Sequence, residues 1–176
     1  MERPRYFVGI DIAAETFTAA AGVEPWRITV KPVAFVNELD SFPKLIGWLG
    51  QHGLNRDQTV LCMEATGVYG EALAYFLEAN GYTLAVEAPL KVKRAFKPYG
   101  IKSDPVDSQQ IAEYACRYWD ELRLWKPKTQ VMEQIKTLLA TWEQFTVQSA
   151  AHQNALRALK RKMVRTPLAE QVHIEA

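Results

Sequence analysis

Four acidic side chains have the types and positions needed to bind divalent metal ions. Asp11 lies within the apolar run "FVGIDIA", and Glu64 ends a second apolar run in "VLCMEATG". Asp104 and Asp107 follow later, three residues apart, in "KSDPVDSQQIA", so one helix face can direct both at the same point. A carboxylate inside an apolar strand costs several kcal/mol unless partners or a cation satisfy it. The pattern therefore predicts a shared cation site.

The chemistry of these ligands narrows the choice of metal. No His or Cys belongs to the set, and all-oxygen ligands suit Mg²⁺ or Mn²⁺ rather than zinc. Two such ions held about 4 Å apart activate a nucleophile and stabilise the leaving oxygen in phosphodiester cleavage. The sequence thus predicts that Asp11, Glu64, Asp104 and Asp107 are both metal ligands and catalytic residues.

The same aspartates also have a purely structural interpretation. Asp104 followed by Pro105 is typical of a helix N-cap with proline at the first helical position. Asp107 would then lie in the first turn, where a carboxylate interacts favourably with the helix dipole. Capping and metal ligation are compatible for Asp107. The positions of Asp11 and Glu64 favour the metal site.

Basic side chains are concentrated in the second half of the chain. Residues 1–90 carry a net charge of −5, whereas residues 91–176 carry +6. Such concentration favours a polyanionic partner, although a solvated helix face is the simpler alternative. Two stretches without acids supply the predicted nucleic-acid contacts: Lys91, Lys93, Arg94, Lys97 and Lys102 in the first, and Arg157, Lys160 and Arg161 in the second.

The elements that must position these side chains follow from the hydrophobic pattern. Residues 5–36 show three consecutive strand patterns, and residues 58–88 hold two more strands separated by a helix. Helices are expected over residues 38–53, 67–81, 89–100 and 105–119. An antiparallel ribbon extended by parallel β-α units makes a mixed sheet with helices on both faces. The predicted fold class is therefore α/β.

A different period begins near Pro127. Apolar positions there alternate spacings of four and three, which is typical of a coiled-coil seam. The seam consists of Val131, Ile135, Leu138, Trp142, Phe145, Ser149, His152, Leu156, Leu159 and Met163. Such a helix is about 50 Å long and is expected to pair with another. We therefore predict a catalytic domain at 1–125, a dimerisation helix at 126–166 and a tail at 167–176.

Composition excludes several classes of protein. No run of 18 apolar residues is present, so no transmembrane helix is expected, and the start "MERPRYFVGID" lacks a signal-peptide core. We therefore expect a cytoplasmic protein without a membrane partner. The two cysteines, Cys62 and Cys116, lie in apolar surroundings and are expected to be buried thiols.

The motifs "VGIDIAAETF", "MEATGVYG" and "IKSDPVDSQQIA" resemble the N-terminal domain of the DEDD transposases. These insertion-sequence recombinases use a RuvC-like domain of the RNase H-like fold and are guided by a bridge RNA, and the DNA invertase that switches pilin genes belongs to the same group. The resemblance covers residues 5–118. It implies Mg²⁺-dependent DNA strand cleavage and transfer, a guide RNA partner, and the four acids above as the four acidic positions.

The resemblance also implies that the helix after Pro127 pairs protomers into a dimer or tetramer. Family members continue into a second domain that bears a serine nucleophile, and no counterpart is found before Ala176. We therefore predict that this chain alone binds metal and nucleic acid but does not complete recombination.

Two other functions remain open from the residues themselves. A phosphotransferase of the actin-like and sugar-kinase class also begins with a "GID" strand, but its following hairpin uses glycine to approach ATP phosphates. Here Ala13 and Ala14 occupy that turn. A non-enzymatic coiled-coil dimerisation module explains the seam, but it leaves Asp11 and Glu64 without a purpose.

Overall fold

The computed structural model describes residues 3–65, 67–96 and 104–162, with the side chains of residues 104–106 and 130 outside the description. The chain divides into two compact units, Met1–Pro127 and Lys128–Ala176. Each unit is described by itself.

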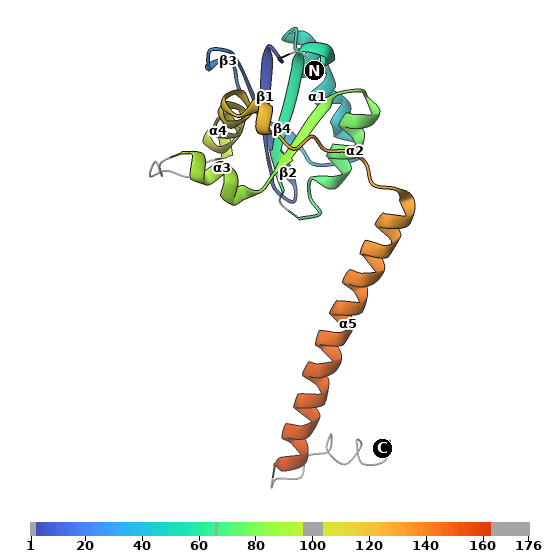
Figure 1. The fold of residues 1–176 in the computed structure, drawn as a ribbon. Helices are drawn as coiled ribbons and strands as arrows, with labels where there is room; N and C mark the ends of the chain where they lie inside the picture. Colours follow the sequence, from blue (N-terminus) through green and yellow to red (C-terminus); the bar gives the residue numbers. More distant parts are fainter. Residues whose placement is uncertain (1–2, 66, 97–103, 163–176) are drawn as a thin grey trace. The chain divides into compact units, whose positions relative to one another are not determined.

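The first unit is built on a mixed five-stranded sheet (Figure 1). Strands β1 (Tyr6–Ile12), β2 (Thr16–Val23) and β3 (Arg27–Val36) form an antiparallel ribbon, and β4 (Thr59–Glu64) and β5 (Thr83–Glu87) run parallel to β1. The strand order is β3-β2-β1-β4-β5. This arrangement confirms the predicted ribbon extended by parallel β-α units.

Helices α1 (Phe42–Gln51) and α2 (Glu71–Ala79) cover one face of the sheet. Their buried side chains join alternate residues of the strands, such as Ile10 and Leu61, in the larger of the two cores. Because side chains alternate along a strand, the residues between these must face the other side.

Helices α3 (Pro89–Ala95) and α4 (Asp104–Arg117) cover that second face. The smaller core lies beneath them and contains Phe7, Cys62, Ala85, Val92, Ile111, Tyr114, Ala115 and Cys116. Both cysteines are buried and free, as the sequence predicted. Helix α4 includes Asp104, which the sequence had placed one residue before the first helical position.

The segment after α4 closes the first unit against β5. Leu124 forms an isolated antiparallel bridge with Ala85, and the Trp125 N–H donates a 2.7 Å hydrogen bond to the carbonyl oxygen of Leu84. The Trp125 ring then meets Tyr75 edge-on, with centroids 4.9 Å apart. These contacts satisfy part of the outer edge of β5 and tie the end of the unit to α2.

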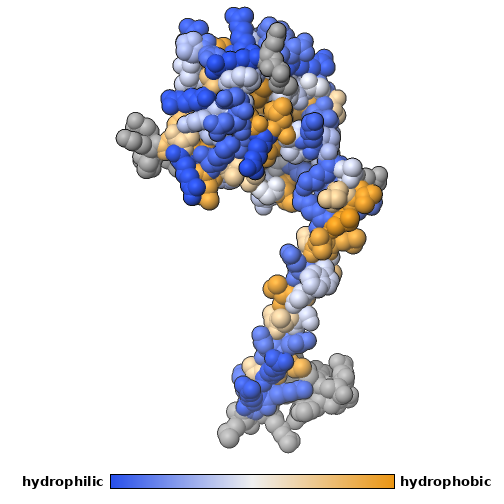
Figure 2. Space-filling view, viewed as in Figure 1, coloured by the Kyte–Doolittle hydropathy of each residue, from blue (hydrophilic) through white to orange (hydrophobic). Residues whose placement is uncertain are grey.

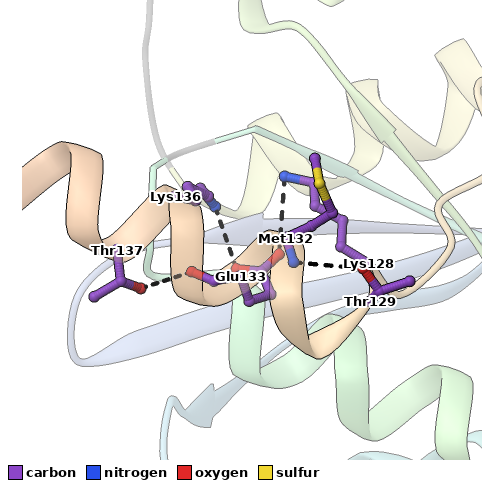
Figure 3. A network of polar contacts seen from close by, with 6 residues as sticks. All are labelled: Lys128, Thr129, Met132, Glu133, Lys136 and Thr137. Carbon is purple, nitrogen blue, oxygen red and sulfur yellow. Dashed lines mark hydrogen bonds and ion pairs between the residues drawn. The ribbon is translucent and has the colours of Figure 1, made fainter.

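The second unit contains one long helix, α5 (Gln130–Arg161). Thr129 caps its start by accepting a hydrogen bond from the Met132 N–H at 3.4 Å. Glu133 lies 3.8 Å from the Lys128 ammonium and 3.9 Å from that of Lys136 (Figure 3). Among the described helices, neither α5 nor any other is apolar enough over sufficient length to cross a membrane.

Candidate active site at the ends of the parallel strands

Asp11 and Glu64 lie side by side at the carboxyl ends of two neighbouring parallel strands. The register of β1 and β4 pairs Gly9 with Cys62 and Ile10 with Met63, so its next step places Asp11 beside Glu64. Adjacent strands are about 4.8 Å apart. Both residues are half-buried. The structure therefore brings these two predicted site residues together.

Both carboxylates belong to the face that α4 covers. Phe7, Gly9 and Asp11 alternate along β1, and Phe7 packs with Cys62 in the core beneath α3 and α4. Glu64 follows Cys62 by two residues and so shares its face. Asp11 and Glu64 therefore extend from the end of the smaller core, where the strands stop and the sheet edge opens. Ligand sites of α/β proteins typically form at such strand ends.

Gly9 fixes how closely α4 approaches this face. A Cβ at Gly9 would lie 2.1 Å from the Ser108 carbonyl oxygen and 2.3 Å from the Ala112 nitrogen. Both are backbone atoms of α4, so the helix rests directly on β1. Only glycine allows this approach, and it places the helix next to the strand position two residues before Asp11.

Helix α4 runs in the opposite direction to β1. Arg3, which precedes β1, lies over the ring of Trp119, which follows α4, at 5.7 Å from the centroid. Arg3 is also ion-paired with Glu24, which directly follows β2, and the pKa of Cys116 near the end of α4 is raised by burial and then by the Glu24 carboxylate. The carboxyl end of α4 thus lies at the start of β1, and its amino end lies toward Asp11.

That direction brings the amino-terminal turn of α4 to the carboxylates of the sheet. Asp107 is half-buried and directly precedes Ser108, the residue that contacts Gly9. Asp104 begins the helix one turn earlier, and its side chain lies outside the described residues. Among the described side chains, no group of three or more His, Cys, Asp or Glu residues gathers closely enough to hold a metal ion. In this structure Asp107 therefore does not gather with Asp11 and Glu64 into a three-carboxylate group, although carboxylate oxygens as a class suit Mg²⁺ or Mn²⁺.

A third strand-end carboxylate, Glu87, was missed by the sequence reasoning. The β4–β5 register pairs Glu64 with Glu87, so Asp11, Glu64 and Glu87 form a row across three parallel strands. Glu87 is only 1% exposed. Its Oε1 accepts a 2.9 Å hydrogen bond from the Arg123 N–H, and its Oε2 lies 3.2 Å from the Lys91 ammonium. Glu87 is therefore fully engaged as a structural carboxylate.

The thiol of Cys62 reports the electrostatics of this row. Burial raises the pKa of Cys62 far above its usual range, and the nearby carboxylates of Glu87 and Glu64 raise it further. The sign of that effect follows from repulsion between a thiolate and the two negative charges. The Lys91 ammonium lowers the same pKa, because it offsets part of the negative charge at Glu87.

Replacing Glu87 by Gln should destabilise the first unit by about 1–3 kcal/mol, because it removes the ion pair with Lys91 and weakens the charge-assisted hydrogen bond from the Arg123 N–H. Urea denaturation followed by tryptophan fluorescence measures the change. The matched control is Glu113→Gln, which breaks the more exposed Glu113–Arg117 pair on α4 and should cost less than about 0.5 kcal/mol. Equal effects of the two substitutions would contradict the structural role of Glu87.

The predicted nucleic-acid contacts fall into three groups. Lys91 forms an ion pair with Glu87 and donates a 3.4 Å hydrogen bond to the carbonyl oxygen of Glu121. Lys93 and Arg94, also on α3, are exposed. Lys97 and Lys102 lie outside the described residues. Arg157, Lys160 and Arg161 are exposed on the last turns of α5, in the second unit.

Comparison with known proteins identifies relatives of the chain. A family model for transposases, the DEDD type of IS110, matches residues 8–163. The pilin gene-inverting proteins of Moraxella bovis and Moraxella lacunata are both 31% identical, over 126 and 125 residues respectively. Each match covers 70% of this chain and 37% of the relative. The chain therefore spans little more than a third of the length of these relatives.

A solved structure shares the fold. RuvC of T. thermophilus, solved in complex with a Holliday junction substrate, superposes with a TM-score of 0.52 at 10% sequence identity. The match covers 69% of this chain and 99% of the RuvC chain. This likeness confirms the expected RNase H-like, RuvC-like fold.

Proposed function

This chain belongs to the IS110-type DEDD transposases, and from that membership we propose that it forms the catalytic part of a DNA recombinase that cleaves and transfers DNA strands with divalent metal ions. The observation that carries the proposal is the arrangement of Asp11 beside Glu64, with the first turn of α4 directed toward them. The naming of the Moraxella relatives as gene-inverting proteins supports DNA as the substrate.

Each acidic residue has a distinct part in the proposed site. Asp11 and Glu64 provide a rigid pair of ligands, because both stand on hydrogen-bonded strands of the central sheet. Asp104 and Asp107 complete the ligand set from α4, whose distance from β1 is fixed by Gly9. Bound Mg²⁺ or Mn²⁺ would supply activation of the attacking oxygen and stabilisation of the leaving oxygen.

The basic residues of α3 would hold the DNA backbone near this site. Lys93 and Arg94 are exposed, and the α3 helix that carries them packs on the same face of the sheet as α4. Neutralising phosphates at that face would offset the negative charge of the carboxylates. Lys91 instead holds the start of α3 against the buried Glu87.

Replacing Lys93 and Arg94 together by Gln should weaken the binding of duplex DNA several-fold. The slope of log K against log [salt] should become shallower by about 2, which is about one for each lost phosphate contact. Fluorescence anisotropy across a range of KCl concentrations measures both quantities. The control is Lys44→Gln, an exposed lysine on α1, which covers the opposite face of the sheet. Binding that weakens equally in the control would show diffuse charge attraction instead.

Guide RNA and protomer pairing belong to the same proposal. Family membership supports an RNA partner, for which Arg157, Lys160 and Arg161 provide exposed positive charge on α5. We assign the catalytic domain to residues 1–125, protomer pairing to 126–166 and a tail to 167–176, in a protein of the cytoplasm. Full recombination would require the longer chain of its relatives.

Binding of Mn²⁺ and DNA by the 176-residue chain tests the proposed function. Isothermal titration should detect Mn²⁺ binding that depends on Asp11 and Glu64, and anisotropy should detect salt-sensitive DNA binding. Binding of ATP without binding of DNA would instead favour the phosphotransferase alternative.

A further inference from the structure

Helix α5 presents an apolar stripe to solvent along its first half. Val131, Leu138, Trp142 and Phe145 are each more than 60% exposed, although they are among the most apolar residues of the chain. The space-filling view shows apolar residues gathered along the first half of the helix and hydrophilic ones toward its end (Figure 2). An apolar stripe of this length is typical of a helix that pairs with another helix.

We infer that α5 pairs with α5 of a second copy of this chain in an antiparallel orientation, centred near Val147. The inference rests on the proposed role of this helix in protomer pairing and adds the orientation. The intervals between successive seam residues alternate between four and three, and this series is symmetric about residue 147. Antiparallel pairing therefore keeps the whole stripe in register.

The sizes of the seam residues match in this orientation. Around a centre at 147, Trp142 faces His152 of the second copy, and Phe145 faces Ser149. Each aromatic ring thus meets a smaller side chain. In a parallel pair the two Trp142 rings would meet each other, and so would the two Ser149 hydroxyls. Interfaces pack best when large and small side chains alternate, so the antiparallel arrangement fills space better.

A depression on the surface of α5 lies along the same seam. It is shallow and is lined by Phe145, Ser149, His152 and Leu156. In the antiparallel pair, Trp142 and Phe145 of the second copy approach that same stretch of helix. The depression thus lies where the large side chains of a second copy would need to fit.

The distribution of charge favours the same orientation. The last turns of α5 carry Arg157, Lys160 and Arg161, and Lys162 follows directly. A parallel pair would place two such basic ends together, with repulsion between like charges. An antiparallel pair separates them by most of the helix length and places Lys160 opposite Gln134 and Lys162 opposite Met132. The basic ends are then free to bind nucleic acid on two sides.

Disulfide crosslinking distinguishes the orientations. Two variants of the full chain are prepared, Ile135→Cys and Leu159→Cys, with tags of different length so that mixed and self-crosslinked dimers differ in mass. They are then mixed under mild oxidation. In the antiparallel pair, residue 135 lies opposite residue 159, whereas the two copies of residue 135 are about 36 Å apart at 1.5 Å per residue. A disulfide requires Cα atoms within roughly 7 Å. We expect crosslinks only in the mixture.

A matched control is Gln144→Cys, on the outward face of α5, which should crosslink neither with itself nor with the other variants. The native cysteines are buried and should not contribute. Crosslinking of Ile135→Cys with itself would show a parallel pair and overturn the orientation. No crosslink in any sample, together with a monomer mass near 20.0 kDa in sedimentation, would overturn pairing itself. Neither outcome would alter metal binding by the first unit, so the two proposals fail separately.

Discussion

Replacing Asp11 by Asn should abolish the stabilisation that Mn²⁺ gives to this chain. Asp11 stands beside Glu64 on neighbouring parallel strands, and the neutral amide of Asn is a weaker metal ligand than the carboxylate it replaces. Even outer-shell changes at metal sites cost roughly 10- to 100-fold in affinity. We therefore expect a loss of at least about 100-fold, measured by titration with Mn²⁺.

The same substitution should have the opposite effect without metal. Two carboxylates side by side on adjacent strands repel each other, so Asp11→Asn should leave the metal-free protein as stable as the wild type or more stable. At a Mn²⁺ concentration about 100 times Kd, the wild type should gain about 2.7 kcal/mol, and the variant should gain almost nothing. Thermal unfolding of both proteins, with and without Mn²⁺, measures these differences in stability.

Asp57→Asn is the matched control for Asp11→Asn. Asp57 lies in the short turn before β4, at the end of that strand opposite to Glu64, and it is exposed. Its replacement should leave the Mn²⁺ response unchanged. A normal Mn²⁺ response in Asp11→Asn, or an equal loss in Asp57→Asn, would contradict a metal site at the strand ends.

Replacing Gly9 by Ala should have the largest effect on stability. The new Cβ would lie 2.1 Å from the Ser108 carbonyl oxygen and 2.3 Å from the Ala112 nitrogen, and neither backbone atom can rotate away. Helix α4 would have to move by more than about 1 Å, because carbon and oxygen rarely approach within 3 Å. Overpacking usually costs 1–3 kcal/mol, and we expect about 3 kcal/mol by urea denaturation.

The shift of α4 should also weaken Mn²⁺ binding, since the helix carries Asp107 and Asp104. Gly50→Ala provides the control: Gly50 is exposed on α1, and a Cβ there meets nothing within 4 Å. This replacement should stabilise the protein by about 0.5–1 kcal/mol, since alanine favours a helix over glycine. A Gly9→Ala variant within about 0.5 kcal/mol of the wild type would refute the close contact of α4 with β1.

The sequence predicted the parts of the site that lie within or at the end of an apolar run. Buried strands are continuous apolar stretches, so an acid at the end of one, such as Glu64, stands out. The order of the strands along the chain followed from the short turns in residues 5–36 and from the helix between the two later strands. These patterns indicated that Asp11 and Glu64 end two strands of one sheet, and the strand order of the structure makes those two strands neighbours.

Other parts depend on tertiary contacts that no local pattern reports. Glu87 ends β5 just as Glu64 ends β4, but its burial depends on Arg123, which is 36 residues away. The role of Gly9 could have been suspected from its place two residues before Asp11 on the same strand face, yet only the position of α4 explains it. Lys91 looked like its basic neighbours, and only the fold pairs it with a buried carboxylate.

We propose that the ends of β1 and β4 and the first turn of α4 form one metal site. Anomalous diffraction from crystals of this chain soaked in Mn²⁺ tests it most directly. We expect manganese within about 2.2 Å of carboxylate oxygens from both Asp11 and Glu64, with Asp104 or Asp107 completing the ligands. Manganese bound elsewhere, or these carboxylates scattered by more than about 10 Å with no ion between them, would contradict the account.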